Sequence, residues 1–136
     1  MIQKIDHVCM MVSDIDKAAE IYRTVYGLQP LPVEIHEALG IKICLIPVGE
    51  VMIEFVQPLE SNTKVVELLK EKGGGLRHIA FRVENLEEAM KMVELKGLKL
   101  RDKEPRPGAA GSRIAFIETD NLTFTPMELV ERRNKE

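Results

Sequence analysis

Two stretches of the sequence decide the fold: residues 5–28, IDHVCMMVSDIDKAAEIYRTVYGL, and residues 76–98, LRHIAFRVENLEEAMKMVELKGL. In each stretch a histidine in a short apolar run is followed by a valine, then by a helix-capping Asp or Asn, an alanine and a closing Gly-Leu. The apolar run is typical of a strand, and a capped segment that ends at glycine is typical of a helix. The chain therefore carries the same strand–helix unit twice.

Each strand–helix unit is followed by a segment that predicts a hairpin with a glutamate in its second strand. The first segment is IKICLIPVGEVMIEFV at residues 41–56, and the second is SRIAFIETDNLTFTPMELV at residues 112–130. The predicted strands cover residues 41–48 and 51–56 in the first copy, and 113–117 and about 124–130 in the second. One more short strand is expected between the helix and the hairpin of each copy, within 28–40 and at 98–100, so the chain is two copies of a β-α-β-β-β unit.

This repeat predicts an α+β fold. A unit this short cannot bury its own sheet face, so we expect the two copies to pack into one curved mixed sheet around a shared site. We predict a single domain over residues 1–136, with tandem modules at about 1–58 and 74–131. A helix over about 61–72, capped by Ser61 or Asn62, links the modules.

The segments between the repeated elements are less regular. We predict a strand followed by a loop over 28–40, which places His36 in a solvated loop, and a short strand over 98–100. A turn is expected at Asp120-Asn121, and the charged tail over 131–136 is expected to fray.

Composition excludes several classes of function. The chain has 136 residues, 45% of them apolar, which is enough for a buried core, and its formal net charge of −3 lacks the basic footprint of nucleic-acid binding. No apolar run approaches the roughly 20 residues that span a bilayer, and no secretory signal is expected from the N-terminus. Cys9 and Cys44 lie in apolar runs and are predicted to be buried, reduced thiols. We therefore expect a cytoplasmic protein without a nucleic-acid or membrane partner.

Four residues stand out because the repeat places a histidine in the first strand and a glutamate in the last strand of each copy: His7, Glu54, His78 and Glu128. One such residue in a strand is usually structural, but both residue types recur at matching positions. A carboxylate on an apolar strand face is costly unless it is paired or bound to a metal. Two imidazoles and two carboxylates suit Co²⁺, Ni²⁺, Mn²⁺ or Zn²⁺ better than Ca²⁺. The pattern predicts a divalent metal site.

These residues and the repeat resemble the vicinal oxygen chelate superfamily, which has the glyoxalase/bleomycin-resistance/dioxygenase fold. Within it, the sequence is most similar to the methylmalonyl-CoA epimerase family, and the similarity covers nearly the whole chain. The motifs that carry it are IDHV, Tyr26-Gly27-Leu28, Pro47-Val48-Gly49-Glu50, IEFVQPLESNT, GGGLRHIAFRVENLEEA and the loop Glu104 to Gly111.

The resemblance implies a metal-dependent isomerase that interconverts the epimers of methylmalonyl-CoA by α-proton abstraction through a metal-stabilised enediolate. It implies an acyl-CoA substrate, a homodimer and a metal held by His7, Glu54, His78 and Glu128. The acid–base groups would be Glu54 and Glu128, with Glu37 as another candidate. Arg106 and Gly108 would meet the CoA phosphates.

Two departures from the family leave alternatives open. The sequence has Glu118-Thr119-Asp120 where many epimerases have His-Pro-Lys, and Ile43 where some relatives carry an acid–base glutamate. A glyoxalase I-like lyase would use the same metal constellation on a glutathione hemithioacetal. A metal-free small-molecule binding module would share the fold but would not need the four ligands.

Overall fold

The computed structural model describes residues 1–119 and 122–133 and contains eight strands, three α-helices and two short 3-10 helices within those residues. In chain order they are β1 (Ile2–Met11), α1 (Ile15–Thr24), β2 (Glu34–His36), η1 (Glu37–Leu39), β3 (Ile41–Val48), β4 (Val51–Pro58), α2 (Thr63–Lys72), β5 (Gly75–Val83), α3 (Leu86–Leu95), β6 (Arg106–Pro107), η2 (Ala109–Gly111), β7 (Arg113–Ile117) and β8 (Met127–Glu131). The predicted α+β class and the two βαβββ copies, separated by α2, are confirmed.

The chain divides into two compact units, and each is described by itself. Unit 1 comprises Met1–His7 and His78–Glu136, and unit 2 comprises Val8–Arg77. Both boundaries cut through a strand, so β1 and β5 contribute residues to both units. The strand order is β2-β3-β4-β1 on the side of unit 2 and β5-β8-β7-β6 on the side of unit 1.

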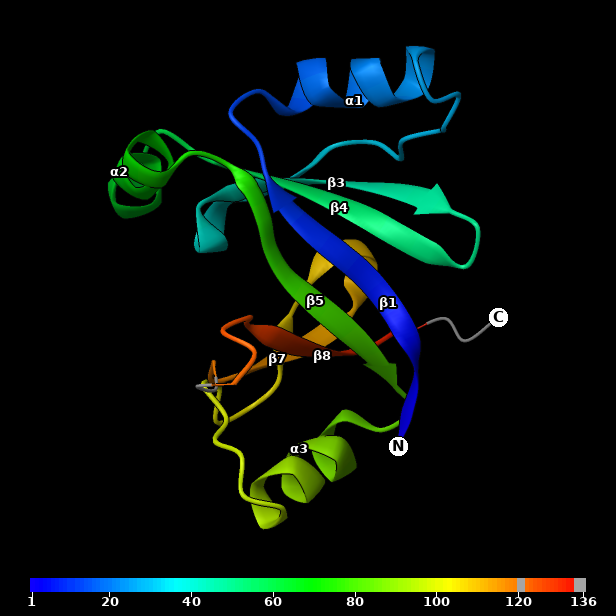
Figure 1. Cartoon of the computed structure of the whole chain (residues 1–136), viewed down its shortest axis with the longest axis vertical. Coiled ribbons are helices and arrows are strands. Elements are labelled where there is room, and N and C mark those ends of the chain that lie inside the picture. The colour runs from blue at the N-terminus through cyan, green and yellow to red at the C-terminus, as the bar shows by residue number, and fades with distance from the viewer. Residues whose placement is uncertain (120–121, 134–136) are drawn as a thin grey trace. The chain divides into compact units, whose positions relative to one another are not determined.

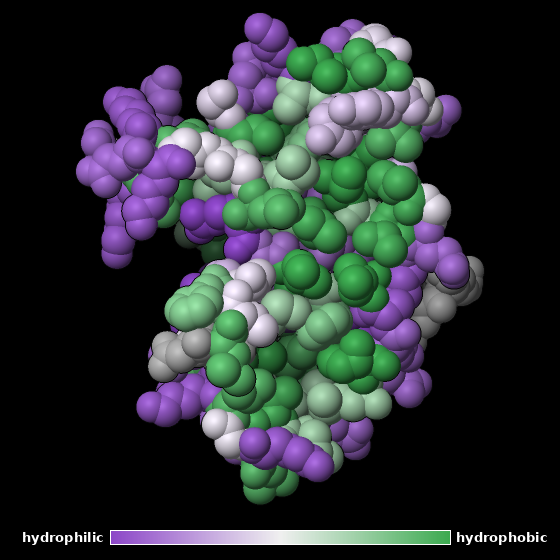
Figure 2. Space-filling model, viewed as in Figure 1, coloured by the Kyte–Doolittle hydropathy of each residue, from purple (hydrophilic) through white to green (hydrophobic). Residues whose placement is uncertain are grey.

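In unit 2, β3 and β4 form an antiparallel hairpin whose register runs from Ile41↔Pro58 to Val48↔Val51. Helix α1 lies along this hairpin (Figure 1), and the core between them is built from Ile15, Cys44, Ile46 and Phe55. Helix α1 is capped by Asp14, whose side chain accepts a hydrogen bond from the Lys17 N–H. By contrast, α2 has no buried residue, and Figure 2 shows hydrophilic side chains gathered over it.

In unit 1, β8 pairs with β5 in parallel and with β7 in antiparallel fashion. The side chains alternate along β8, so Leu129 faces one side of the sheet while Glu128 and Val130 face the other. On the Leu129 side, α3 packs against β7 and β8 (Figure 1) over a core that includes Leu86, Met90 and Ala115. The opposite side carries the glutamate, and it is the side on which the candidate site is built.

Several sequence-based boundaries were wrong. Over 28–40 the order is reversed, because the irregular segment comes first and β2 follows it by pairing with β3. His36 is therefore the last residue of a strand, half-buried with Nε2 2.8 Å from Glu34 Oε1, rather than a solvated loop residue. Only Leu100 of the expected strand over 98–100 makes a β-bridge, to Ile117.

The C-terminal strand also differs from its prediction. It begins at Met127 rather than near Phe124, because Phe124 has a φ of 56° and the N–H-less Pro126 follows it. The expected turn at Asp120-Asn121 lies outside the described residues, as does the tail beyond 133. Glu131 does not fray, since it is the last residue of β8 and pairs with Arg113.

The predicted caps of α2 and α3 are confirmed. Asn62 caps α2 by accepting from the Val65 N–H, and Asn85 caps α3 by accepting from the Glu88 N–H. Cys9 and Cys44 are both buried, and neither forms a disulfide with a described residue. Among the described residues, every helix is too short or too polar to cross a membrane.

Candidate metal centre

Three of the four predicted ligands come together within unit 1. His7 is on β1, His78 on β5 and Glu128 on β8, where Glu128 lies opposite Ala80 of β5 in the parallel register. The imidazole centroids of His7 and His78 are 5.5 Å apart, with the rings inclined at 73°. Glu128 Oε1 is 3.2 Å from His7 Nε2, and Glu128 Oε2 is 3.6 Å from His78 Nε2. The carboxylate thus reaches both imidazoles.

This cluster lies in an apolar environment. His7 and Glu128 are 2% and 3% exposed, and the same side of the sheet carries a small apolar cluster of Ala80, Ile114, Phe116 and Val130. The Phe116 ring meets the His78 ring edge-on, with centroids 5.0 Å apart. Water is largely excluded, so the carboxylate and the imidazoles interact strongly with one another or with an ion.

Asp6 is a residue of this site that the sequence analysis missed. It is fully buried, and its Oδ2 lies 2.7 Å from His7 Nδ1. Two arginines hold the same carboxylate: Arg82 Nε is 2.9 Å from Oδ1, and Arg132 Nη2 is 2.5 Å from Oδ2. The only signal in the sequence was its place directly before His7 in the IDH motif.

The charge state of Asp6 follows from these contacts. Burial raises the pKa of Asp6, but the hydrogen bond from His7, the hydrogen bond and charge of Arg132, and the hydrogen bond from Arg82 together outweigh it. The net result is a pKa well below the ordinary value of 3.8. Asp6 is therefore ionised at neutral pH.

An ionised Asp6 determines the tautomer of His7. An ionised carboxylate only accepts hydrogen bonds, so His7 Nδ1 carries a proton and, in the neutral imidazole, Nε2 carries the lone pair. Nε2 and Glu128 Oε1 are then two acceptors 3.2 Å apart, and Glu128 Oε1 makes no hydrogen bond to any described residue. A cation near these atoms removes the repulsion, and imidazole with carboxylate is a donor set that divalent transition metals bind. The residues present therefore fit a divalent metal.

The remaining predicted site residues are Glu54, Glu37, Arg106 and Gly108. Glu54 belongs to unit 2, where it is 7% exposed on β4 and pairs with Leu45 of β3. Its place in that hairpin corresponds to Glu128, which pairs with Phe116 of β7. Glu37 also belongs to unit 2, in η1, and its side chain is exposed.

Arg106 and Gly108 have structural contacts of their own. The Arg106 Nε is 3.3 Å from Asp102 Oδ1, and its guanidinium carbon is 5.3 Å from the Phe116 ring centroid. Gly108 is required by packing, because a Cβ there would lie 2.6 Å from Ser112 Oγ. Their role toward CoA phosphates stays a prediction.

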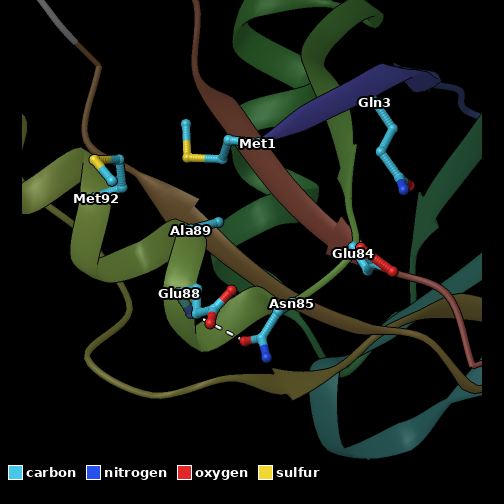
Figure 3. A pocket seen from close by; sticks show the side chains of 7 residues that line it. All are labelled: Met1, Gln3, Glu84, Asn85, Glu88, Ala89 and Met92. Carbon is cyan, nitrogen blue, oxygen red and sulfur yellow. Dashed lines mark hydrogen bonds between the residues drawn. The ribbon is translucent and has the colours of Figure 1, made fainter.

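Unit 1 also has a pocket of about 420 Å³ (Figure 3). It is lined by Met1, Gln3, Glu84, Asn85, Glu88, Ala89 and Met92, so it includes none of the predicted ligands. Its Asn85 side chain is the α3 cap, which Figure 3 shows as a hydrogen bond to Glu88.

Known proteins similar to this chain include methylmalonyl-CoA epimerases, which are isomerases. Over 128 residues, covering 94% of this chain and 91% of the relative, it is 34% identical to the uncharacterized protein YqjC of Bacillus subtilis. It is 28% identical to the ethylmalonyl-CoA/methylmalonyl-CoA epimerase of Cereibacter sphaeroides over 95% of this chain and 98% of that protein.

Solved structures agree with this similarity. The methylmalonyl-CoA epimerase of Mycobacterium tuberculosis superposes with a TM-score of 0.89 at 30% identity, covering 98% of this chain and 91% of that one. A methylmalonyl-CoA epimerase in complex with methylmalonyl-CoA and NH4+ gives a TM-score of 0.91 at 27% identity, covering 100% and 99%. The resemblance predicted from the sequence is confirmed. With the matching family model spanning residues 6–116, the repeat and the fold have one common explanation: the chain belongs to the Glyoxalase/Bleomycin resistance protein/Dioxygenase superfamily.

Proposed function

We propose that this chain is a metal-dependent methylmalonyl-CoA epimerase. The observation that carries the proposal is the buried cluster of His7, His78 and Glu128, in which a carboxylate oxygen without a hydrogen bond lies 3.2 Å from an imidazole nitrogen. This cluster occurs in a chain that is similar over nearly its whole length to enzymes named for that substrate. The reaction inverts the carbon between a thioester and a carboxylate, whose proton is acidic because the adjacent carbonyl accepts the charge.

We propose that the metal ligands are His7, Glu54, His78 and Glu128. His7, Glu54 and His78 are a donor combination able to hold a metal ion, and Glu54 is the counterpart of Glu128 in the other hairpin. A bound divalent ion supplies positive charge that stabilises the negative charge developing on the substrate oxygens. Asp6 holds His7 in the tautomer whose Nε2 lone pair can bind, and the apolar residues around Glu128 limit competing water.

Inversion needs proton removal on one face of the carbon and proton delivery on the other. We assign these roles to Glu54 and Glu128, because the repeat provides one carboxylate from each copy at matching positions. Glu37 is the alternative base, and its exposed position on η1 leaves it accessible to a substrate. Glu37→Gln should leave proton exchange intact if the assigned pair is correct.

The proposal is tested with one epimer of methylmalonyl-CoA in D₂O, following both deuterium at the α-carbon and the epimer ratio. We expect deuterium to enter while the epimers equilibrate, and a chelator to stop both. Methylglyoxal with glutathione is run in parallel. Turnover of the hemithioacetal alone would indicate a lyase, and the absence of both metal binding and turnover would favour a binding module.

We also propose a cytoplasmic homodimer, as the resemblance implies. Light scattering at micromolar concentration should give twice the chain mass of 15.4 kDa. A mass equal to one chain would contradict the dimer.

A further inference from the structure

Two arginines lie against the aromatic ring that touches the candidate metal centre. The Arg101 guanidinium carbon is 4.3 Å from the Phe116 ring centroid, and that of Arg106 is 5.3 Å from it. Phe116 in turn contacts His78 edge-on. A guanidinium stacked on an aromatic ring keeps its N–H groups at its edge, where they can bind a carboxylate or a phosphate.

The backbone fixes this arrangement. Arg101 N donates to Phe116 O at 2.8 Å, and the Asp102 carboxylate accepts from Phe116 N at 2.7 Å. The other oxygen of Asp102 lies 3.3 Å from Arg106 Nε. Asp102 therefore anchors the chain next to β7 and orients Arg106. The backbone hydrogen bond of Arg101 to Phe116 holds Arg101 beside the ring.

The charges of the two arginines are balanced differently. Arg106 has Asp102 as its ion-pair partner, whereas no described carboxylate forms an ion pair with Arg101. The Arg101 side chain is also exposed, which makes it accessible to a ligand. In a chain of net charge −3, residues 99–106 (KLRDKEPR) carry four basic and two acidic side chains. The segment is locally positive next to the candidate site, which attracts an anion.

We propose that Arg101, supported by Arg106 on the Phe116 ring, binds the free carboxylate of the acyl group and so selects dicarboxylic acyl-CoA substrates. This inference rests on the proposed function and deepens it. The substrate has two kinds of anionic group that a guanidinium binds, the acyl carboxylate and the CoA diphosphate, and distance favours the carboxylate. The contacts of 4.3 Å from Arg101 to Phe116 and 5.0 Å from Phe116 to His78 keep the guanidinium under 10 Å from the His78 ring. An extended pantetheine arm puts the diphosphate on the order of 15 Å from the thioester.

The experiment compares Arg101→Gln and Arg101→Lys with Lys103→Gln, an exposed control in the same segment that loses the same charge. Binding of methylmalonyl-CoA, propionyl-CoA and free CoA is measured by calorimetry on the metal-free protein, together with KM and kcat of the metal-loaded one. Propionyl-CoA lacks only the carboxylate, and free CoA retains every phosphate.

We expect Arg101→Gln to weaken methylmalonyl-CoA binding and raise KM by about tenfold. Propionyl-CoA and CoA binding should stay within twofold of wild type. Arg101→Lys should fall between, since an ammonium keeps the charge but not the planar fork, and Lys103→Gln should match wild type.

Three results would overturn the inference. Equal weakening of all three ligands would assign Arg101 to the phosphates instead. An unchanged methylmalonyl-CoA affinity in Arg101→Gln would remove its role altogether, and a wild-type protein that does not prefer methylmalonyl-CoA to propionyl-CoA would show that the carboxylate is not recognised. Failure of the proposed function is distinct, because it would appear as wild-type protein that binds methylmalonyl-CoA selectively without exchanging its α-proton.

Discussion

Replacing Asp6 with asparagine should weaken both the fold and the metal centre. Asp6 accepts four hydrogen bonds, one from His7, one from Arg82 and two from Arg132. Asparagine keeps the shape but turns one carboxylate oxygen into an NH2 group that donates. In either amide orientation, two of the four donors then face another donor, and two guanidinium groups lose their counter-ion.

The size of the effect follows from burial. Removing one partner of a buried ion pair costs about 3–5 kcal/mol. Arg82 and Arg132 are 28% and 11% exposed, so water offsets part of the loss and the lower end applies, about 3 kcal/mol. His7 is no longer held with its proton on Nδ1, and loss of such a partner lowers metal affinity by about 10–100-fold.

Urea unfolding followed by circular dichroism, in the presence of a chelator, measures the stability of the metal-free protein. Calorimetric titration with Co²⁺ measures the affinity. The matched control is Asp16→Asn, which removes the same charge from the exposed first turn of α1 and should change stability by less than about 1 kcal/mol. The reasoning is refuted if Asp6→Asn behaves like Asp16→Asn in both measurements.

Three further predictions concern unit 1. Glu128→Gln keeps the side-chain volume but removes the charge, so elemental analysis after exposure to Co²⁺ should find substoichiometric metal; a full equivalent would remove Glu128 from the ligand set. Gly108→Ala should lower the free energy of unfolding in urea by about 1–3 kcal/mol, because the new Cβ would lie 2.6 Å from Ser112 Oγ. An unchanged free energy of unfolding would show that the loop shifts to accommodate the methyl group. The hydrogen bond from Arg113 lowers the pKa of Glu87 from 4.5 to about 2, so the stability this pair provides is present above pH 4.5 and is lost as the pH falls toward 2. As the pH falls from 4.5 to about 2, the free energy of unfolding of Arg113→Met should therefore decrease less than that of the wild type in acid-unfolding curves. Identical slopes for the two proteins would count against the pair.

The sequence alone determined the architecture and most of the candidate ligands, because both are recorded locally. Capping side chains, closing glycines and apolar runs act within a few residues, so the helices α1 and α3 and the hairpin strands could be located from them. The repeat then marked His7, His78, Glu54 and Glu128, because chance rarely places the same two residue types at matching positions twice. Of these, His7, His78 and Glu128 lie together in unit 1.

Tertiary structure alone decided which distant residues serve the site. Asp6 meets Arg82 and Arg132 across 76 and 126 positions of the chain, and Arg132 belongs to a tail whose charged composition predicted fraying. Strand β2 likewise exists because β3 offers it a pairing edge. The packing of strands that are remote in sequence determines which residues become such partners. A buried carboxylate forms ion pairs with the cationic side chains that this packing places near it. No local pattern in the sequence carries that information.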